Sequence, residues 1–185
     1  MHALSNKELR QILEAARAVR ERDWLMILVA FSHGLRVSEL TGFTSNAVRD
    51  GYLTIQRLKG SLKTTQALLE SEDPLFNEKD ALVKFARRAR AGRPVFNISR
   101  VQFWRLMKRY GRDAGIPEHK NHPHILKHSI ATQALKAGAG IEDVRQHLGH
   151  KSLSSTGAYL RVSDQEAGQA IHRALNSSTP ENRNK

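Results

Sequence analysis

The stretch HPHILKHS, residues 122–129, contains three histidines and one lysine within eight positions. A helix is predicted over residues 123–137, and it places His124, Lys127 and His128 at positions i, i+3 and i+4. Residues at this spacing project from one face of a helix, so the three side chains can converge on one ligand. The stretch therefore predicts a binding or catalytic site.

Two kinds of ligand are compatible with these histidines. His119 and His122 extend the cluster, and imidazole is a common zinc ligand. However, Pro123 interrupts the run, no HExxH spacing occurs, and Lys127 lies inside the cluster, where its charge opposes a bound cation. Imidazole and ammonium groups instead hydrogen-bond phosphate oxygens and offset their charge. We therefore predict an anion site with no metal and no cofactor.

The composition of the chain indicates a polyanionic partner. Its 185 residues include 30 Lys plus Arg against 18 Asp plus Glu, which gives a formal net charge of +12. An excess of this kind is typical of nucleic-acid-binding proteins. The chain has no Cys, which excludes disulfides and thiolate zinc sites. We expect a cytoplasmic, nucleoid-associated protein without a membrane partner, because the longest apolar run, residues 24–31, is far shorter than the roughly 20 residues of a membrane span.

The first half of the chain is predicted to contain two helices, a short helical segment and a β-hairpin. Ser5 and Glu8 have the spacing of a capping box at the start of a helix over residues 5–20. A second helix over residues 23–33 ends at Gly34, and VSEL, residues 37–40, resumes helical character. Beyond Gly51, YLTIQR and LKTTQALL alternate as strands around the turn LKGS, which places Lys59 near the hairpin tip.

The second half is predicted to be helical. Helices are expected to start near Asn77, Ser99 and Pro123, and shorter ones over IEDVRQHLGH, around Tyr159 and over residues 163–175. We expect one mainly α-helical α+β domain over residues 1–175, with a small antiparallel sheet at one edge. The polar residues 176–185 are expected to form a disordered tail.

Two further residues complement the histidine cluster. Arg36 follows a glycine turn in GLRVSEL, and its planar guanidinium can hold two phosphate oxygens at once. Tyr159 lies nine residues after His150, and a tyrosine can attack a phosphodiester to give a phosphotyrosine. With an ordinary pKa of about 10, its phenol needs a base or cationic surroundings to react.

The order of these elements resembles the tyrosine recombinases, the family of phage integrases. The chain has Arg in GLRVSEL, Lys in a hairpin turn, HxxK on a helix, LGH and then Tyr, over nearly its whole length. IQRLKGSLKTTQALL and HPHILKHS look most like the short recombinases that switch bacterial fimbrial promoters. The resemblance implies a site-specific recombinase, of integrase or invertase type, that breaks and rejoins DNA through a 3′-phosphotyrosyl intermediate.

The resemblance also implies a role for individual residues. Tyr159 matches the nucleophile and Arg36 the first phosphate-binding arginine, while Lys59, with Lys63 as runner-up, matches the general acid that protonates the leaving 5′ oxygen. The remaining matches are His124 in the HxxR element, its supporting neighbour His128, the second active-site histidine His150 and the orienting carboxylate Glu39. We expect DNA contacts from basic residues that include Arg57, Lys63, Arg105, Lys108 and Arg109.

One residue departs from the family pattern. Lys127 stands where the family has its second arginine, and lysine offers a point contact in place of a bidentate fork. Two alternatives follow, a working enzyme adjusted to lysine and a catalytically impaired DNA-binding regulator. If Lys127 holds the phosphate too loosely, Lys127→Arg should raise the rate of DNA cleavage. A tenfold lower cleavage rate, equal to about 1.4 kcal/mol in activation free energy, would instead indicate a pocket adapted to lysine. A type IB topoisomerase-like enzyme is a third alternative.

The resemblance implies partners as well. Double-stranded DNA is the expected substrate. The protein is expected to be a monomer without DNA and to form a homotetramer on DNA. Accessory DNA-bending proteins are possible further partners. The segment AGQAIHRAL, residues 167–175, is a candidate for docking on a neighbouring protomer, or for packing in cis. Integration, excision and inversion remain equally compatible with the sequence.

Overall fold

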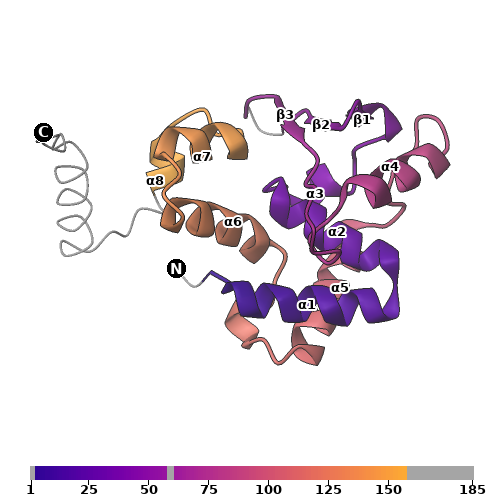
Figure 1. The fold of residues 1–185 in the computed structure, drawn as a ribbon, viewed down its shortest axis with the longest axis horizontal. Helices are drawn as coiled ribbons and strands as arrows, with labels where there is room; N and C mark the ends of the chain where they lie inside the picture. The colour runs from indigo at the N-terminus through magenta and orange to yellow at the C-terminus, as the bar shows by residue number, and fades with distance from the viewer. Residues whose placement is uncertain (1–2, 58–60, 158–185) are drawn as a thin grey trace, which may run out of the picture.

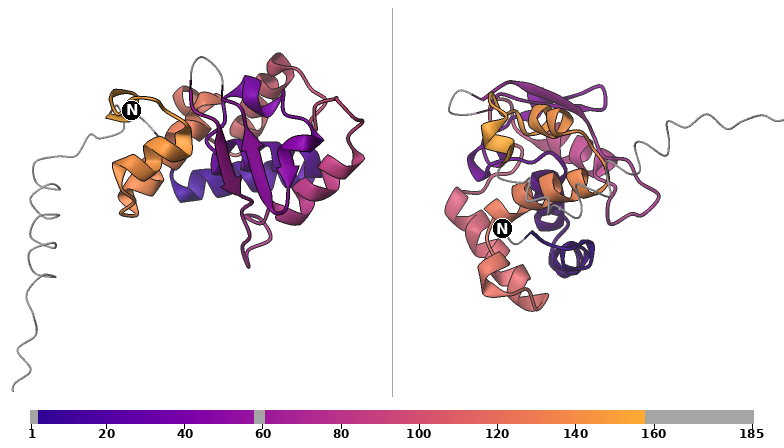
Figure 2. Two further views of the ribbon diagram at one scale, coloured as in Figure 1. Left: turned by 90° about the horizontal axis from the view of Figure 1, so that it is seen from above. Right: turned by 90° about the vertical axis from the view of Figure 1, so that its left-hand side faces the viewer.

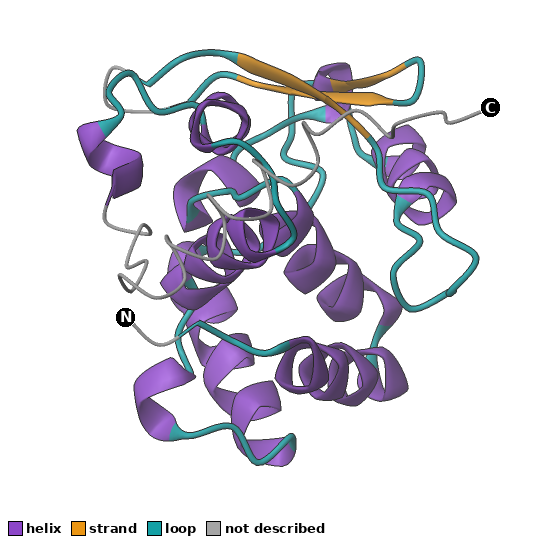
Figure 3. Ribbon diagram, turned by 60° about the vertical axis from the view of Figure 1, so that its left-hand side comes forward, coloured by secondary structure: helices purple, strands orange, loops and turns teal. Residues whose placement is uncertain are grey.

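A computed structural model describes residues 3–57 and 61–157 of the chain. Helices form most of the described structure, and a three-stranded antiparallel sheet lies along one edge (Figure 1). Figure 3 shows this sheet on one side of the helices. The predicted class, mainly α-helical with a small sheet at one edge, is therefore confirmed.

The first two helices supply much of the hydrophobic core. Helix α1, Asn6–Val19, buries Leu9, Ile12, Leu13 and Ala16. Its predicted capping box is present, because Ser5 N donates to Glu8 Oε2 at 2.7 Å and Glu8 N donates to Ser5 Oγ at 3.2 Å. Helix α2, Glu21–Ser32, is buried from Asp23 to Phe31, as expected for a core helix.

A glycine turn separates α2 from the short helix α3, Val37–Leu40. Gly34 has a φ of +56°, and a Cβ built there would lie 2.5 Å from Leu148 Cδ2. A side chain would therefore be strained and would also clash. The turn packs against Leu148, and Arg36, the N-cap of α3, lies close enough to His150 for its charge to act on that residue.

The sheet consists of β1, Val48–Arg49, β2, Tyr52–Ile55, and β3, Thr64–Ala67, in that spatial order. Strands β2 and β3 form the predicted hairpin, with Ile55 paired to Thr64. They run side by side in the left view of Figure 2. Strand β1 was not predicted, since two residues are too short to show an alternating pattern. The predicted tip residue Lys59 lies outside the described residues.

Helices α4, Lys79–Arg88, and α5, Arg100–Asp113, follow the sheet. The predicted start at Ser99 is correct, because Ser99 and Gln102 form a capping box. The start predicted near Asn77 is close to the observed one, since Glu78 is the N-cap of α4, and the Asn77 amide donates to Ser71 O at 3.0 Å. Two 3-10 turns, η1 and η2, cover Ser45–Ala47 and Glu118–Lys120.

Three helices end the described chain. Helix α6, His124–Lys136, starts after Pro123 as predicted, and α7, Ile141–Leu148, and α8, Ser154–Gly157, follow it. In Figure 1, α7 and α8 lie beyond α6, near the hairpin end of the sheet. The helix predicted over residues 163–175 and the predicted tail lie outside the described residues.

Helix α6 is tied to the start of the chain. Leu4 N donates to the buried Ser129 Oγ at 2.8 Å, and Gln133 Nε2 donates to Leu4 O at 3.0 Å. Just before α6, Lys120 Nζ lies 2.8 and 3.0 Å from the two carboxylate oxygens of Glu8. These contacts fix α6 against the N-terminal end of α1. Over residues 3–57 and 61–157, none of the helices has the length and apolar character needed to cross a bilayer.

Candidate active site

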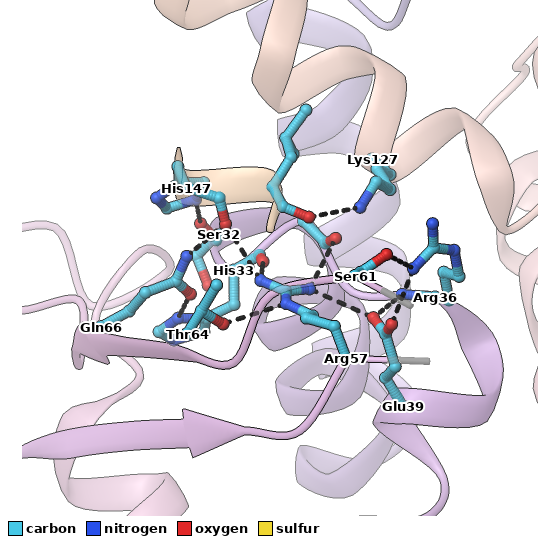
Figure 4. A network of polar contacts seen from close by, with 12 residues as sticks. Ser32, His33, Arg36, Glu39, Arg57, Ser61, Thr64, Gln66, Lys127 and His147 are labelled. Carbon is cyan, nitrogen blue, oxygen red and sulfur yellow. Dashed lines mark hydrogen bonds and ion pairs between the residues drawn. The ribbon is translucent and has the colours of Figure 1, made fainter. Parts of the chain in front are cut away.

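The candidate site forms where the start of α3, helix α6 and the end of α7 meet beside the hairpin (Figure 4). Arg36 is positioned at the start of α3, and its side chain is 29% exposed. Its Nη1 donates to Glu39 Oε1 at 3.0 Å and lies 3.4 Å from Ser61 Oγ, next to the hairpin turn. The guanidinium is thus held from one side while part of it stays accessible to a ligand.

Glu39 is a fully buried carboxylate that joins two arginines. Its Oε2 accepts from the Arg36 backbone N at 2.8 Å and from Arg57 Nη1 at 3.1 Å. Because its other oxygen binds the Arg36 side chain, Glu39 orients both the backbone and the guanidinium of Arg36. This geometry supports the predicted orienting role of Glu39.

Arg57 lies inside the protein, with a fully buried side chain. It was predicted to contact DNA, and this prediction is wrong for the described structure, because every guanidinium N–H faces a protein acceptor. The acceptors are Thr64 Oγ1, Gly34 O, Glu39 Oε2, His33 O and His147 O, at distances from 2.8 to 3.1 Å. Burial lowers the pKa of Arg57, and Glu39 opposes that shift.

Lys127, which stands where the family pattern has an arginine, is also buried, with 3% of its surface exposed. Its Nζ donates to Leu148 O at 3.1 Å, near the end of α7. Burial lowers the pKa of Lys127 to about 7, and the charges of Arg57 and Arg36 add to the shift while Glu39 opposes it. The ammonium is therefore poised to change its charge near neutral pH.

His150 is buried beside these cations. It follows Gly149, which ends α7 in the left-handed conformation with a φ of +67°. Its Nδ1 lies 3.1 Å from Thr156 Oγ1 of α8. Burial lowers the pKa of His150 to about 4, with further lowering by Lys127, Arg36 and Arg57. The imidazole is consequently neutral at pH 7.

The two histidines of α6 stack edge to face. The ring centroids of His124 and His128 are 5.1 Å apart, with an interplanar angle of 73°. Burial lowers both pKa values, that of His128 to about 4, and the charges of neighbouring groups, Lys127 among them, lower them further. Both rings are therefore neutral hydrogen-bonding groups at pH 7.

The structure thus brings Arg36, Lys127, His124 and His150 into one electrostatic neighbourhood, as predicted for a phosphate site. Lys63 is exposed just before β3, while Lys59 and Tyr159 lie outside the described residues. The predicted DNA-contacting residues Arg105, Lys108 and Arg109 lie on α5. Lys108 pairs with Glu118 and lies 5.3 Å from the centre of the Trp104 ring, and Arg109 lies 3.8 Å from Asp113.

The charges of the site suit an anion. In the part of the chain that the structure describes, no group of three or more His, Asp or Glu side chains is arranged to hold a metal ion. The nearby acid Glu39 is already bound by two arginines. The groups that remain, a partly accessible guanidinium, an ammonium and imidazole rings, match the oxygens of a phosphodiester.

Comparison with known proteins assigns the chain to a family. Residues 2–166 match the phage integrase family, to which the chain therefore belongs. The chain is 33% identical over 184 residues to tyrosine recombinase XerA of Pyrococcus furiosus, covering 93% of this chain and 61% of the relative. It is 30% identical over 166 residues to the type 1 fimbriae regulatory protein FimE of Escherichia coli K12, covering 84% and 83%. The resemblance inferred from the motifs is thus confirmed.

Solved structures share the fold. The crystal structure of XerA recombinase superposes with a TM-score of 0.73 at 22% identity, covering 94% of this chain and 63% of the other. The catalytic domain of bacteriophage HP1 integrase superposes with a TM-score of 0.67 at 20% identity, covering 98% of this chain and 99% of the other. XerH recombinase bound to its difH substrate gives 0.72 at 20% identity, covering 91% and 53%. The chain spans about three fifths of the length of the XerA relatives, and nearly all of the HP1 catalytic domain.

Proposed function

We propose that this chain is a site-specific DNA recombinase that cuts and rejoins DNA through a 3′-phosphotyrosyl intermediate. The observation that supports this most strongly is the convergence of Arg36, Lys127 and His150 from distant parts of the sequence, each near the others' charge. Such a pocket offsets the negative charge that builds on a phosphodiester as it is attacked.

The proposed reaction needs no cofactor. The Tyr159 phenol gives its proton to a neighbouring base, and its oxygen attacks the scissile phosphorus to form the phosphotyrosyl bond. The bond to the 5′ oxygen breaks, and Lys59 donates a proton to that oxygen. The 5′ hydroxyl of a partner strand then attacks the phosphorus of the phosphotyrosyl link and passes its proton to Lys59. The bond to Tyr159 breaks, and the tyrosine oxygen takes back a proton. The first step keeps the phosphate in a diester, so the second step requires no energy from ATP.

DNA binding is proposed to extend from this pocket over exposed basic residues. Lys63 flanks the hairpin turn, and Arg105 and Arg109 are exposed on α5. Lys108 is a weaker candidate, since Glu118 already neutralises it. The XerH recombinase structure that shares this fold is bound to its difH substrate, which supports double-stranded DNA as the partner of this chain. A nucleoid-associated location follows from this substrate.

Assembly is proposed to be a homotetramer on DNA and a monomer in its absence. The described part of the chain offers a mainly apolar groove between α6 and α7, lined by Ile130, Ala131, Ala134, Ala139, Val144 and Leu148 together with Asp143 and His147. The apolar residues of AGQAIHRAL, 167–175, suit such a groove in composition. This supports docking of that segment, on the same or on a neighbouring protomer.

A nicked substrate tests the proposal. A duplex nicked close to the cleavage point loses its short 5′-hydroxyl strand after attack, so the covalent adduct accumulates. The wild-type chain should form this adduct on DNA from the flanks of its locus, and Tyr159→Phe should form none. An adduct that persists in Tyr159→Phe removes this residue from the role. Specific DNA binding without any wild-type adduct would favour a regulator, and relaxation of supercoils without strand exchange a topoisomerase.

A further inference from the structure

Arg57 lies at the centre of the polar network in Figure 4, yet the proposed mechanism gives it no part. We propose that Arg57 is a positioning residue, which holds the phosphate-binding Arg36 and the loop of His150 in fixed relation to each other. This assignment rests on the proposed recombinase function. It adds a residue that acts through its neighbours and not through contact with DNA.

The guanidinium of Arg57 is saturated by protein acceptors. An arginine has five N–H donors, and the five of Arg57 are matched by five oxygens. The side chain is fully buried. A phosphate could bind Arg57 only by displacing one of these contacts and opening the core. The geometry therefore assigns Arg57 an internal task.

The acceptors belong to the segments that carry the site. His33 O and Gly34 O belong to the turn that precedes Arg36, and the Glu39 carboxylate binds Arg36 directly. Thr64 Oγ1 belongs to β3, just beyond the hairpin turn. The His147 carbonyl lies three residues before His150. One rigid, planar group thus sets the spacing of the glycine turn, the hairpin and the end of α7.

The end of α7 is held by two cations. The last carbonyl groups of a helix have no intrahelical partner and carry partial negative charge. Arg57 Nη2 binds His147 O at 3.0 Å, and Lys127 Nζ binds the next carbonyl, Leu148 O, at 3.1 Å. Since lysine provides a single head group at this position, Arg57 adds the directional contact that fixes how α7 presents His150.

The network is braced from a second side. Gln66 Nε2 also donates to His147 O at 2.7 Å, and Gln66 Oε1 lies 2.7 Å from His33 Nδ1. His33 Nε2 lies 2.5 Å from the buried carboxylate of Glu78. The amide of Gln66 is therefore oriented at both ends, and the carbonyl that Arg57 binds has little freedom to move.

Thr64 allows a mild test in the full-length chain. Thr64→Val keeps the shape of the side chain but removes the acceptor for Arg57 Nε, whereas Thr64→Ser keeps the hydroxyl. On the nicked substrate at saturating DNA, Thr64→Val should form adduct about tenfold more slowly, the effect expected for one lost hydrogen bond to a charged group. Thr64→Ser should restore most of the rate. The DNA dissociation constant should stay close to wild type in both variants.

A second variant reports on the charge of Arg57. Lys127 is surrounded by Arg36, Glu39, Arg57, His124, His128, His147 and His150. Arg57→Gln removes one of the cations that lower the pKa of Lys127, so the alkaline limb of the adduct rate should move to higher pH. Thr64→Val keeps the charge and should leave the limb in place. A general loss of folding would lower the adduct rate of both variants and would not shift the alkaline limb in Arg57→Gln alone.

The outcomes separate this assignment from the proposed function. Equal rates for wild type and Thr64→Val, or equal losses in Thr64→Val and Thr64→Ser, would overturn the positioning role of Arg57 while adduct formation itself stands. Weaker DNA binding with an unchanged rate at saturation would show that Arg57 acts in binding, and would overturn it as well. A wild-type chain that forms no adduct would contradict the recombinase function, and with it the assignment. Arg49→Gln, an exposed arginine of β1, should match wild type throughout.

Discussion

Lys127 Nζ donates to the Leu148 carbonyl oxygen at 3.1 Å, and this contact joins α6 to the end of α7. The residue therefore has two tasks, a structural one at the carbonyl and, in the proposed function, an electrostatic one at the phosphate. An ammonium has three N–H donors, which allows both at once. Because Lys127 is buried among cations, its charge depends on pH in a way that the family's arginine would not.

The pH dependence of cleavage should report Lys127. Its pKa of about 7 means that the DNA-free enzyme carries the charged ammonium below that pH and loses it above. The second-order rate of adduct formation should therefore fall as the pH rises through about 7. Lys127→Arg keeps its charge, so the ratio of variant to wild-type rates should rise between about pH 6 and pH 9. A ratio that stays constant over this range would contradict the predicted titration.

Lys127 should also make stability depend on pH. Its pKa is lowered from 10.5 to about 7 on folding, so between these values the unfolded chain binds more protons than the folded chain. The contribution of Lys127 to the free energy of unfolding should thus rise with pH across this window, by up to about 1.4 kcal/mol per pH unit. Urea unfolding of the wild type and Lys127→Met at several pH values measures the difference in slope. Equal slopes would show that Lys127 stays charged when folded.

Gly149 should not tolerate a side chain. Its φ is +67°, and a Cβ built there would lie 2.8 Å from Arg57 Cγ and 3.0 Å from Leu62 O. Gly149→Ala should lower the free energy of unfolding by more than the roughly 1–2 kcal/mol of the left-handed backbone alone, and should slow adduct formation. Gly115→Ala is the matched control, because its φ is +69° and nothing lies within 4 Å of the built Cβ. Equal losses of unfolding free energy in both variants would show that the Arg57 side chain moves aside at little energetic cost.

The basic residues of α5 should contribute to the salt dependence of DNA binding. Arg105 and Arg109 are exposed on α5. If each contacts one phosphate, changing each to Gln should reduce the slope of log K against log salt by about 0.9. Titrations at several salt concentrations measure the slope. An unchanged slope in the double variant would place the DNA on another surface.

Tyr110 should matter for stability and not for cleavage. Its hydroxyl donates to Asp23 Oδ2 at 2.8 Å in the core between α2 and α5, and burial together with Asp23 raises its pKa to about 12. Tyr110→Phe leaves that carboxylate oxygen without this donor and should cost about 1–2 kcal/mol. Thermal unfolding measures the cost, while the adduct rate at saturating DNA should be unchanged. A slower rate in the folded variant would extend the site to this region of the core.

Local signals in the sequence predicted much of the fold. The Ser5 and Glu8 pair marked the start of α1, and the apolar run of residues 24–31 marked the buried α2. The spacing of His124 and Lys127 predicted one side of the site, because helical geometry fixes which residues share a face. How far apart Arg36, Lys127 and His150 lie depends on long-range packing, and only the resemblance indicated that they meet.

Arg57 shows where this reasoning failed. Leu53 and Ile55 are buried, and Arg57 continues their period of two along the same strand direction, which predicts an inward side chain. Its charge suggested DNA instead, because an unpaired buried charge is costly. The five acceptors that make burial possible come from four separate segments, and no short stretch of sequence reveals them.

The link between Leu4 and α6 has a practical consequence. Leu4 is hydrogen-bonded to both Ser129 and Gln133, so the backbone just ahead of α1 and the helix that carries Lys127 are mechanically coupled. Tension applied to that backbone, by a surface attachment or a bulky fusion partner, would reach α6 through these two hydrogen bonds, and with it the proposed phosphate pocket. Handles for pulling or immobilising the protein should therefore disturb the proposed site least when they are attached through side chains remote from this junction.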